Sequence, residues 1–205
     1  LLEKAFKLDI QDARILMELD QLYKRLNRSH ADRLAFFEKY RAVAFSRDDL
    51  YLEYVTLLNQ SGRYEEAIRM IDARRFHPWE GGEGKVPAQY QLARVELVKA
   101  YLKAGENEKA LDLIEECFIY PHNLGEGKLY GAQENDFNYY KACALQVLGR
   151  EAEARELFLV ASIGNSQPAA AMYYNDQKPD KIFYQGLALR KLGREDEARG
   201  RFNRL

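Results

Sequence analysis

Apolar residues recur along this chain every three or four positions, as in amphipathic helices, and the helices come in pairs joined by short turns. The clearest pair lies within residues 92–118 and turns at Gly105. Four such glycines are spaced 43, 44 and 44 residues apart, and an alanine follows each of them five positions later. A repeat of this kind predicts an array of helix pairs instead of one globule. The glycines and their alanines are Gly62, Gly105, Gly149, Gly193, Ala67, Ala110, Ala154 and Ala198.

Three further positions keep their character relative to each turn glycine. The residue seven before it is mostly small, and those four before and nine after it are large and apolar, a set that lets paired helices interlock. In chain order the three sets are Val55, Val98, Ala142 and Gly186; Leu58, Tyr101, Leu145 and Leu189; Ile71, Ile114, Phe158 and Phe202.

The first pair departs from this pattern. We expect its helices over residues 12–26 and about 31–45, with Asn27 in place of the turn glycine, because asparagine tolerates the left-handed conformation. The position five residues later holds Asp32 where the other repeats have an alanine. This repeat therefore needs a small insertion at its turn.

Two long loops, residues 74–89 and 119–134, interrupt the helices. Their glycines and prolines argue against regular helix, and both contain the sequence GEGK, 43 residues apart. A third linker, residues 162–180, lacks GEGK. The remaining helices are expected at 49–59, 64–73, 135–148, 151–161, 181–192 and 195–202.

The offsets around the turn glycines resemble those of the tetratricopeptide repeat (TPR) family. The resemblance implies an all-α, right-handed solenoid of antiparallel helix pairs, with the family's unit of about 34 residues lengthened here by extended loops. The phrases FHPWEGGEGK, YPHNLGEGK and GAQEND also resemble the carboxy-terminal repeat region of large bacterial proteins whose amino-terminal domain has no known function. We expect one TPR-like domain over 1–205, with the end of a preceding repeat at 1–10 and repeats at 11–47, 48–90, 91–134, 135–180 and 181–205, the last incomplete.

Composition narrows the classes of partner. The 31 basic and 32 acidic side chains nearly cancel, so no global field favours nucleic acid or an anionic membrane. No apolar run approaches a membrane span, and the start has no signal-peptide layout. We expect a cytoplasmic fragment of a larger protein. Cys117 and Cys143 fit neither a disulfide framework nor a CxxC metal site, so both are expected to be reduced packing residues.

The GEGK loops do not match a phosphate-binding P-loop, which requires GxxxxGK followed by Ser or Thr. Trp79 and His122 stand where the first glycine would be, and Val86 and Leu129 follow the lysines. We therefore expect no nucleotide and no other cofactor.

Two interpretations of the loops remain open. In the first they are turns that Trp79 and Tyr120 anchor on the helices. In the second, neighbouring loops stack on one rim and present aromatic and charged groups to a partner or a sugar. The candidate rim residues are Phe76, His77, Trp79, Glu80, Glu83, Lys85, Tyr120, His122, Asn123, Glu126 and Lys128.

Catalysis and metal binding have little support. The three histidines are scattered, and no nucleophile motif accompanies the acids that could be paired for acid–base work. Those acids are Glu80, Glu83, Glu126, Glu134 and Asp136. We predict no catalytic and no metal-binding residues.

A groove lined by the first helix of each pair is the other candidate surface. Its lysines and arginines suit an acidic peptide or a carboxylate, although a merely solvated surface is equally open. Leu52 and Thr56 stand where the chaperone-tail clamp of some TPR proteins needs Lys and Asn. The candidate groove residues are Thr56, Asn59, Lys99, Lys103, Tyr139, Gln146, Arg190 and Lys191.

These observations predict a non-catalytic scaffold that docks a protein, a peptide or another domain of its own chain. The alternative is an accessory part of an enzyme, possibly acting on carbohydrate, whose GEGK loops border an active site on a missing domain. A pocket lined by Trp79, Tyr120 and paired carboxylates would favour that alternative.

Overall fold

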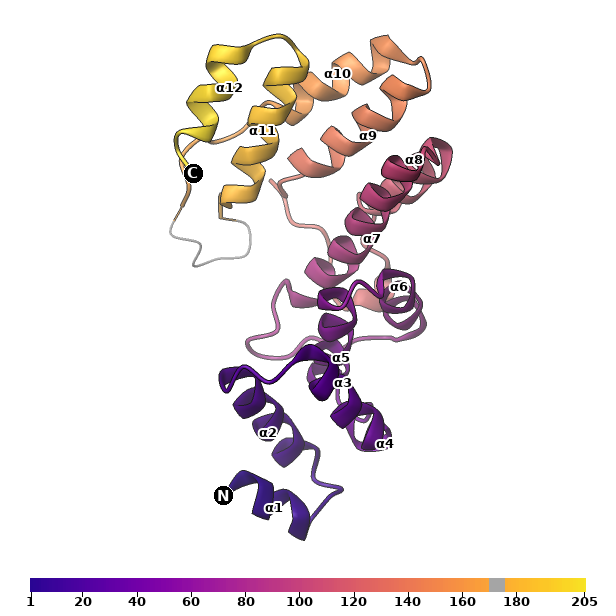
Figure 1. Cartoon of the computed structure of the whole chain (residues 1–205), viewed down its shortest axis with the longest axis vertical. Coiled ribbons are helices and arrows are strands. Elements are labelled where there is room, and N and C mark those ends of the chain that lie inside the picture. Colours follow the sequence, from indigo (N-terminus) through magenta and orange to yellow (C-terminus); the bar gives the residue numbers. More distant parts are fainter. Residues whose placement is uncertain (170–175) are drawn as a thin grey trace. The chain divides into compact units, whose positions relative to one another are not determined.

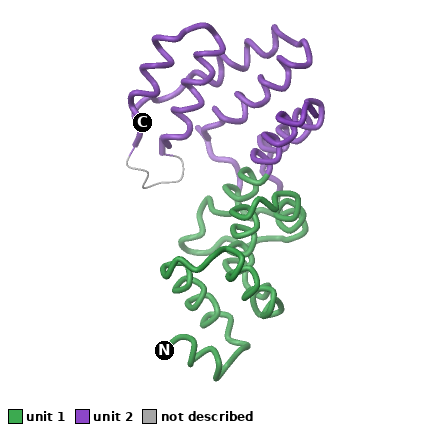
Figure 2. Tube along the Cα trace, in the orientation of Figure 1, with its two compact units in different colours: residues 1–93, 122–126 green, residues 94–121, 127–205 purple. Residues whose placement is uncertain are grey.

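The computed structural model describes residues 1–169 and 176–205. Within these residues the chain is all-α, with twelve α-helices, one short 3-10 helix and no strand (Figure 1). It forms two compact units (Figure 2). Unit 1 comprises residues 1–93 and 122–126, and unit 2 comprises residues 94–121 and 127–205.

Unit 1 has one continuous core along its helix pairs. Fully buried members include Leu16, Phe37, Leu50 and Val55, and Leu124 from the second loop joins the same core. Its elements are α1 (Leu2–Leu8), α2 (Ala13–Arg25), α3 (His30–Lys39), α4 (Arg41–Ala44), α5 (Asp48–Gln60), α6 (Tyr64–Ala73), the start of α7 (Lys85–Ala104) and η1 (His122–Leu124).

Unit 2 contains the rest of α7 and five further helices. The pairs α9–α10 and α11–α12 are antiparallel, and α11 also packs on both α9 and α10 (Figure 1). Val98, Ala110 and Ile114 join the second half of α7 to the helix that follows it. The further helices are α8 (Asn107–Glu116), α9 (Asn135–Val147), α10 (Glu151–Ala161), α11 (Pro179–Lys191) and α12 (Glu195–Phe202).

All the predicted turns share one geometry. The four turn glycines have φ between 73° and 79°, and Asn27 has φ 54°, so its predicted role is confirmed. At each turn the next amide donates to the carbonyl five residues back, as Arg28 does to Tyr23 at 3.0 Å and Arg63 to Leu58 at 2.9 Å. This is the Schellman ending, which satisfies the last carbonyls of a helix.

The expected insertion in the first repeat is also present. α3 begins three residues after Asn27, whereas α6, α8, α10 and α12 begin two residues after their glycines.

The insertion places Arg33 where later repeats have a buried alanine. Asp20, seven residues before Asn27, takes the place of their small residue. The two side chains are 2% and 0% exposed and pair bidentately, with Arg33 Nε and Nη2 at 2.9 and 2.8 Å from the Asp20 oxygens.

Some helix bounds differ from the sequence predictions. The helix expected at 31–45 is interrupted at Tyr40, whose φ of −115° and ψ of 34° separate α3 from α4. The loop expected at 74–89 ends early, because α7 begins at Lys85 and holds Pro87 in its first turn, where a missing N–H costs no helical bond. The expected linker 162–180 falls partly outside the described residues.

Across the described residues, no helix combines the length and the apolar character needed to cross a bilayer.

Candidate interaction surfaces

The two GEGK loops contact each other within unit 1. Asn123 Nδ2, in the second loop, donates to the carbonyls of Ile71 and Arg74 at 2.9 and 3.1 Å, at the end of α6. The Phe76 amide donates in return to the Asn123 carbonyl at 2.7 Å. Asn123 therefore ties the second loop to the start of the first.

The second loop approaches the first closely at Gly125. A Cβ on Gly125 would lie 2.8 Å from the Phe76 carbonyl oxygen, so only glycine fits there without a shift of the backbone. The Gly84 amide donates to Glu126 Oε2 at 2.7 Å. We call residues 74–84 and 122–126, joined by these contacts, the loop cluster.

Asp48 anchors the loop cluster to α5. Its carboxylate accepts from Arg74 Nε at 2.6 Å and from the His77 amide at 2.8 Å. Burial opposes ionisation, but these donors outweigh it and lower the pKa of Asp48 below its ordinary value. Asp48 therefore holds the chain at the exit of α6.

The surface of the loop cluster has a pocket of about 300 Å³ that is open to solvent. It is lined by Pro78, Trp79, Glu80, Gly82, Glu83 and Glu126. The Trp79 ring lies directly on Gly82, where a Cβ would come within 2.3 Å of it. Three carboxylates and no basic side chain line this pocket, so we call it the acidic pocket. Charge and an aromatic face together favour a cationic guest.

The remaining rim residues have different roles. Phe76 is 2% exposed and packs on Tyr51 in the core, so it offers no binding surface. His77 is exposed beside Asp48, and Lys85 is the first residue of α7. His122 is exposed on η1 in the loop cluster. Tyr120 and Lys128 belong to unit 2, where Lys128 forms an ion pair with Glu134.

The two candidate groove residues of unit 1 bond within their own unit. Thr56 Oγ1 donates to the Leu52 carbonyl one turn earlier at 2.8 Å. Asn59 is 4% exposed and its Nδ2 donates to the carbonyl and the side chain of Gln89 at 3.2 and 2.9 Å. Asn59 therefore joins α5 to the start of α7 instead of facing a groove.

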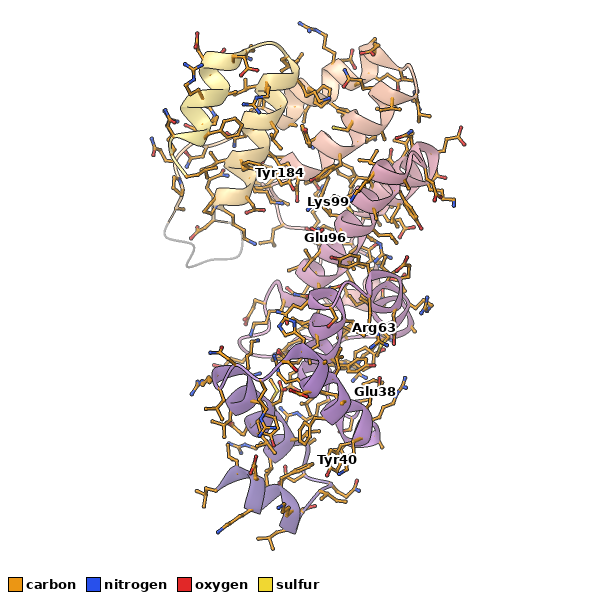
Figure 3. The ribbon with its side chains drawn as sticks, viewed as in Figure 1. Glu38, Tyr40, Arg63, Glu96, Lys99 and Tyr184 are labelled. Atoms are coloured by element: carbon orange, nitrogen blue, oxygen red, sulfur yellow. The ribbon has the colours of Figure 1, made fainter. Side chains whose placement is uncertain are left out.

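Among the lysines and arginines of the predicted groove, Lys99 forms the closest ion pair with a carboxylate. It lies on α7 with Glu96, near Tyr184 of α11 (Figure 3), and its Nζ is 2.5 Å from Glu96 Oε1. Burial opposes its charge, but bonds to Glu96 and Tyr184 outweigh it and raise the pKa of Lys99. The Tyr140 and Tyr184 hydroxyls share a hydrogen bond of 3.0 Å beside it.

The other groove residues of unit 2 form no single patch of free charge. Lys103 is exposed, and Arg190 lies 3.5 Å from Glu195 with its guanidinium over the Phe202 ring. The half-buried Tyr139 packs on Phe158 and Tyr184. Lys191 Nζ donates to Gln146 Oε1 at 2.9 Å.

Both cysteines are reduced, and burial raises the pKa of both thiols, that of Cys117 to about 12. Protonated thiols suit the packing role predicted for both residues, and Cys117 is fully buried. Within residues 1–169 and 176–205, no three His, Cys, Asp or Glu side chains are grouped so that they could hold a metal ion.

Asp48 and Arg74 support the loop cluster, but neither could be assigned to it from the sequence. Neither belongs to a motif, and they are 26 residues apart, so no local pattern signals their contact. Comparison with known protein families adds no assignment, since no family model matches the chain.

Proposed function

We propose that this chain is a non-catalytic docking scaffold, a TPR-like array of helix pairs that binds a protein or peptide through its loop cluster. The observation that carries this proposal is the acidic pocket, formed by two loops whose chain segments are 43 residues apart and bonded to each other. Loops held by such bonds lose little conformational entropy when a partner binds. Loops tied down only to close the fold would not need to present Trp79 and three carboxylates together.

The TPR-like architecture is part of the proposal. It is supported by the identical Schellman turns, the buried small residues at fixed offsets, and the packing of α11 on both helices of the preceding pair. Each helix pair leaves an apolar face that only a neighbour covers, so such an array offers extended surfaces to partners.

The test is a selection of random peptides by display on the intact chain, followed by affinity measurement of the selected peptides. We expect basic peptides, and we expect Trp79→Ala to weaken them at least about tenfold, as for an aromatic anchor in a pocket. Tyr130→Ala is the matched control, because Tyr130 is a fully exposed aromatic outside the acidic pocket. Selected peptides that bind Trp79→Ala and the parent equally would refute docking at this pocket.

An accessory role in a carbohydrate-active enzyme is the second candidate, favoured by the carboxylates beside Trp79. Tyr120, however, does not line the pocket, and one oxygen of Glu126 is engaged by the Gly84 amide. A glycan array probed with the parent and with Trp79→Ala separates the two functions. Glycan binding that is lost in Trp79→Ala, without any selected peptide, would favour the enzyme role.

A further inference from the structure

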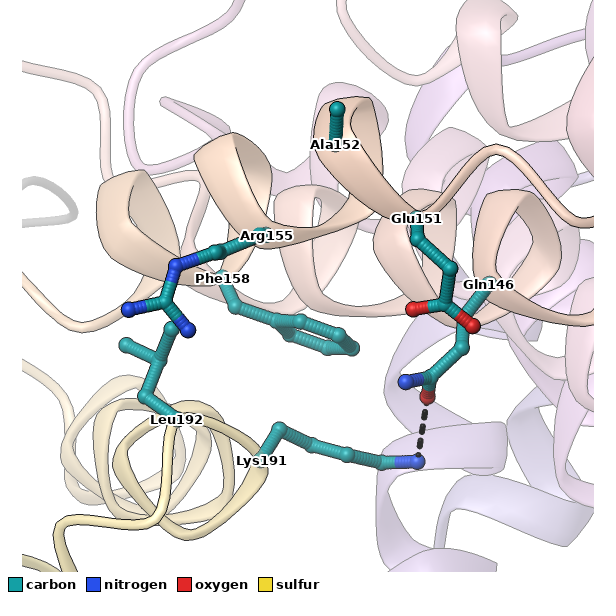
Figure 4. Close-up of a pocket in the computed structure, with 7 residues that line it drawn as sticks. All are labelled: Gln146, Glu151, Ala152, Arg155, Phe158, Lys191 and Leu192. Atoms are coloured by element: carbon teal, nitrogen blue, oxygen red, sulfur yellow. Dashed lines mark hydrogen bonds between the residues drawn. The ribbon is translucent and has the colours of Figure 1, made fainter.

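A second pocket lies wholly within unit 2, where α11 packs on the pair α9–α10 (Figure 4). Its volume is about 310 Å³. Gln146 comes from α9, Lys191 from α11 and Leu192 from the residue that ends α11; α10 supplies Glu151, Ala152, Arg155 and Phe158. No residue of the loop cluster contributes, so binding here is independent of the acidic pocket.

The floor of this pocket is apolar. The Phe158 ring is only 2% exposed and closes the base of the pocket, whereas Ala152 and Leu192 are more exposed and offer apolar surface to a guest. The ammonium group of Lys191 lies 5.8 Å from the centre of that ring, and Leu192 lies beside the Arg155 guanidinium. An apolar floor with charged groups at its edges accommodates a guest that has an aliphatic stem and a charged head.

The two ends of the pocket differ in charge. At one end, Lys191 donates to Gln146 at 2.9 Å and Glu151 lies nearby (Figure 4). At the other end is Arg155, which forms no ion pair with any carboxylate of the described residues. Arg150 and Arg194 differ from Arg155 in this respect. Each forms an ion pair with a glutamate three residues later in the sequence, Glu153 and Glu197 respectively. Neither Lys191 nor Arg155 forms an ion pair with a carboxylate of the described residues, but Glu151 lies on the Lys191 side (Figure 4), so Arg155 is the less compensated of the two cations.

We propose that this pocket binds a glutamate side chain from a segment of a partner protein. The carboxylate would pair with Arg155 and the aliphatic stem would lie against Leu192, beside the guanidinium. A guanidinium binds a carboxylate through two parallel hydrogen bonds, which makes it more selective than an ammonium group. Glu151 repels a carboxylate at the opposite end, so the direction of the guest is defined as well.

The experiment compares two defined probes on the intact chain. One is the acetylated, amidated pentapeptide alanine–leucine–glutamate–leucine–alanine, and the other has glutamine in place of glutamate. Titrations are followed by NMR of the ¹⁵N-labelled protein, including the Nε–Hε signal of Arg155. We expect this signal to shift saturably with the glutamate peptide and the glutamine peptide to bind at least about tenfold more weakly, because the charge-assisted pair is lost.

Variants locate the binding. Arg155→Glu is expected to weaken the glutamate peptide at least about tenfold, and Glu151→Gln is expected to tighten it by removing a repelling charge. Arg199→Glu is the matched control. Arg199 occupies the same position in its repeat, six residues after the turn glycine, but it does not line the pocket. The Arg199→Glu variant should therefore bind the glutamate peptide with the same affinity as the parent protein.

Three results would overturn the proposal. The first is equal affinity of the parent for both peptides, and the second is unchanged affinity in Arg155→Glu. The third is an identical set of shifts, at the same affinity, from inorganic phosphate, which would make this a general anion site. The comparison of the two peptides uses only the parent protein, so it tests the proposal even if a variant fails to fold. A failure here leaves the acidic pocket untested and intact, because that pocket is assayed through Trp79→Ala.

Discussion

The buried pair Asp20–Arg33 makes the sharpest prediction about stability. Arg33→Met leaves the Asp20 carboxylate buried without its bidentate partner, while Glu53, which also contacts Arg33 at 2.6 Å, keeps Lys24 at 3.0 Å. Removing one member of a buried ion pair costs about 3–5 kcal/mol. Asp20→Leu should cost less, because Arg33 retains Glu53 as a partner.

The double variant Asp20→Leu plus Arg33→Met replaces the pair with apolar side chains, as the later repeats do at these positions with Val55 and Ala67. Similar exchanges elsewhere are neutral or stabilising by about 1–4 kcal/mol, since two desolvated charges are removed together. The double variant is therefore expected to be more stable than either single variant. This order distinguishes a desolvated pair from an exposed one.

The assay is urea unfolding followed by tryptophan fluorescence, because Trp79 is the one tryptophan of the chain and lies in unit 1 with the pair. Arg63→Met, which breaks the exposed pair with Glu66 in the same unit, is the control and should leave the transition nearly unchanged. Burial raises the pKa of Asp20, although Arg33 opposes the shift. Because protonation removes the unpaired charge, the loss in Arg33→Met should shrink as the pH falls. A loss under about 1 kcal/mol at neutral pH would refute the reasoning.

Three further predictions concern the loop cluster and the thiols. The lowered pKa of Asp48 means that its stabilisation is fully present above the unfolded-state pKa of about 4 and is lost as the pH falls through the folded value. The urea midpoints of the parent and Asp48→Asn should therefore differ at pH 7 and converge in acid; a constant difference would contradict this. Gly125→Ala should speed hydrogen exchange of the Phe76 amide, because the new Cβ meets the Phe76 carbonyl. Gly131→Ala, with φ +79° and open space, imposes similar backbone strain without that contact and should leave the Phe76 amide protected. Cys117, whose pKa is raised to about 12, should react with a thiol reagent at pH 8 only on unfolding, and rapid labelling of the folded chain would contradict its burial.

Local backbone conformation could be predicted from the sequence. A turn glycine, or Asn27, is required wherever the chain adopts positive φ at a helix end, and that requirement depends on one residue and its neighbours. The same reasoning located the insertion after Asn27, because Asp32 interrupts the spacing of the small residues. Helix starts were less accessible: Pro87 suggested a loop, although proline is tolerated in the first turn of a helix.

The sequence by itself determined the helix pairs, their Schellman turns and the presence of two related loops, since each depends on residues close in the chain. Only the tertiary structure decided that Phe76 and Asn59 are buried, and that Asn123 and Glu126 join the loop that contains Trp79. The pairings of Asp20 with Arg33 and of Asp48 with Arg74 likewise depend on which faces of different helices meet. Periodicity predicts which side of a helix is apolar, but partners across an interface are selected by packing and desolvation of the whole unit.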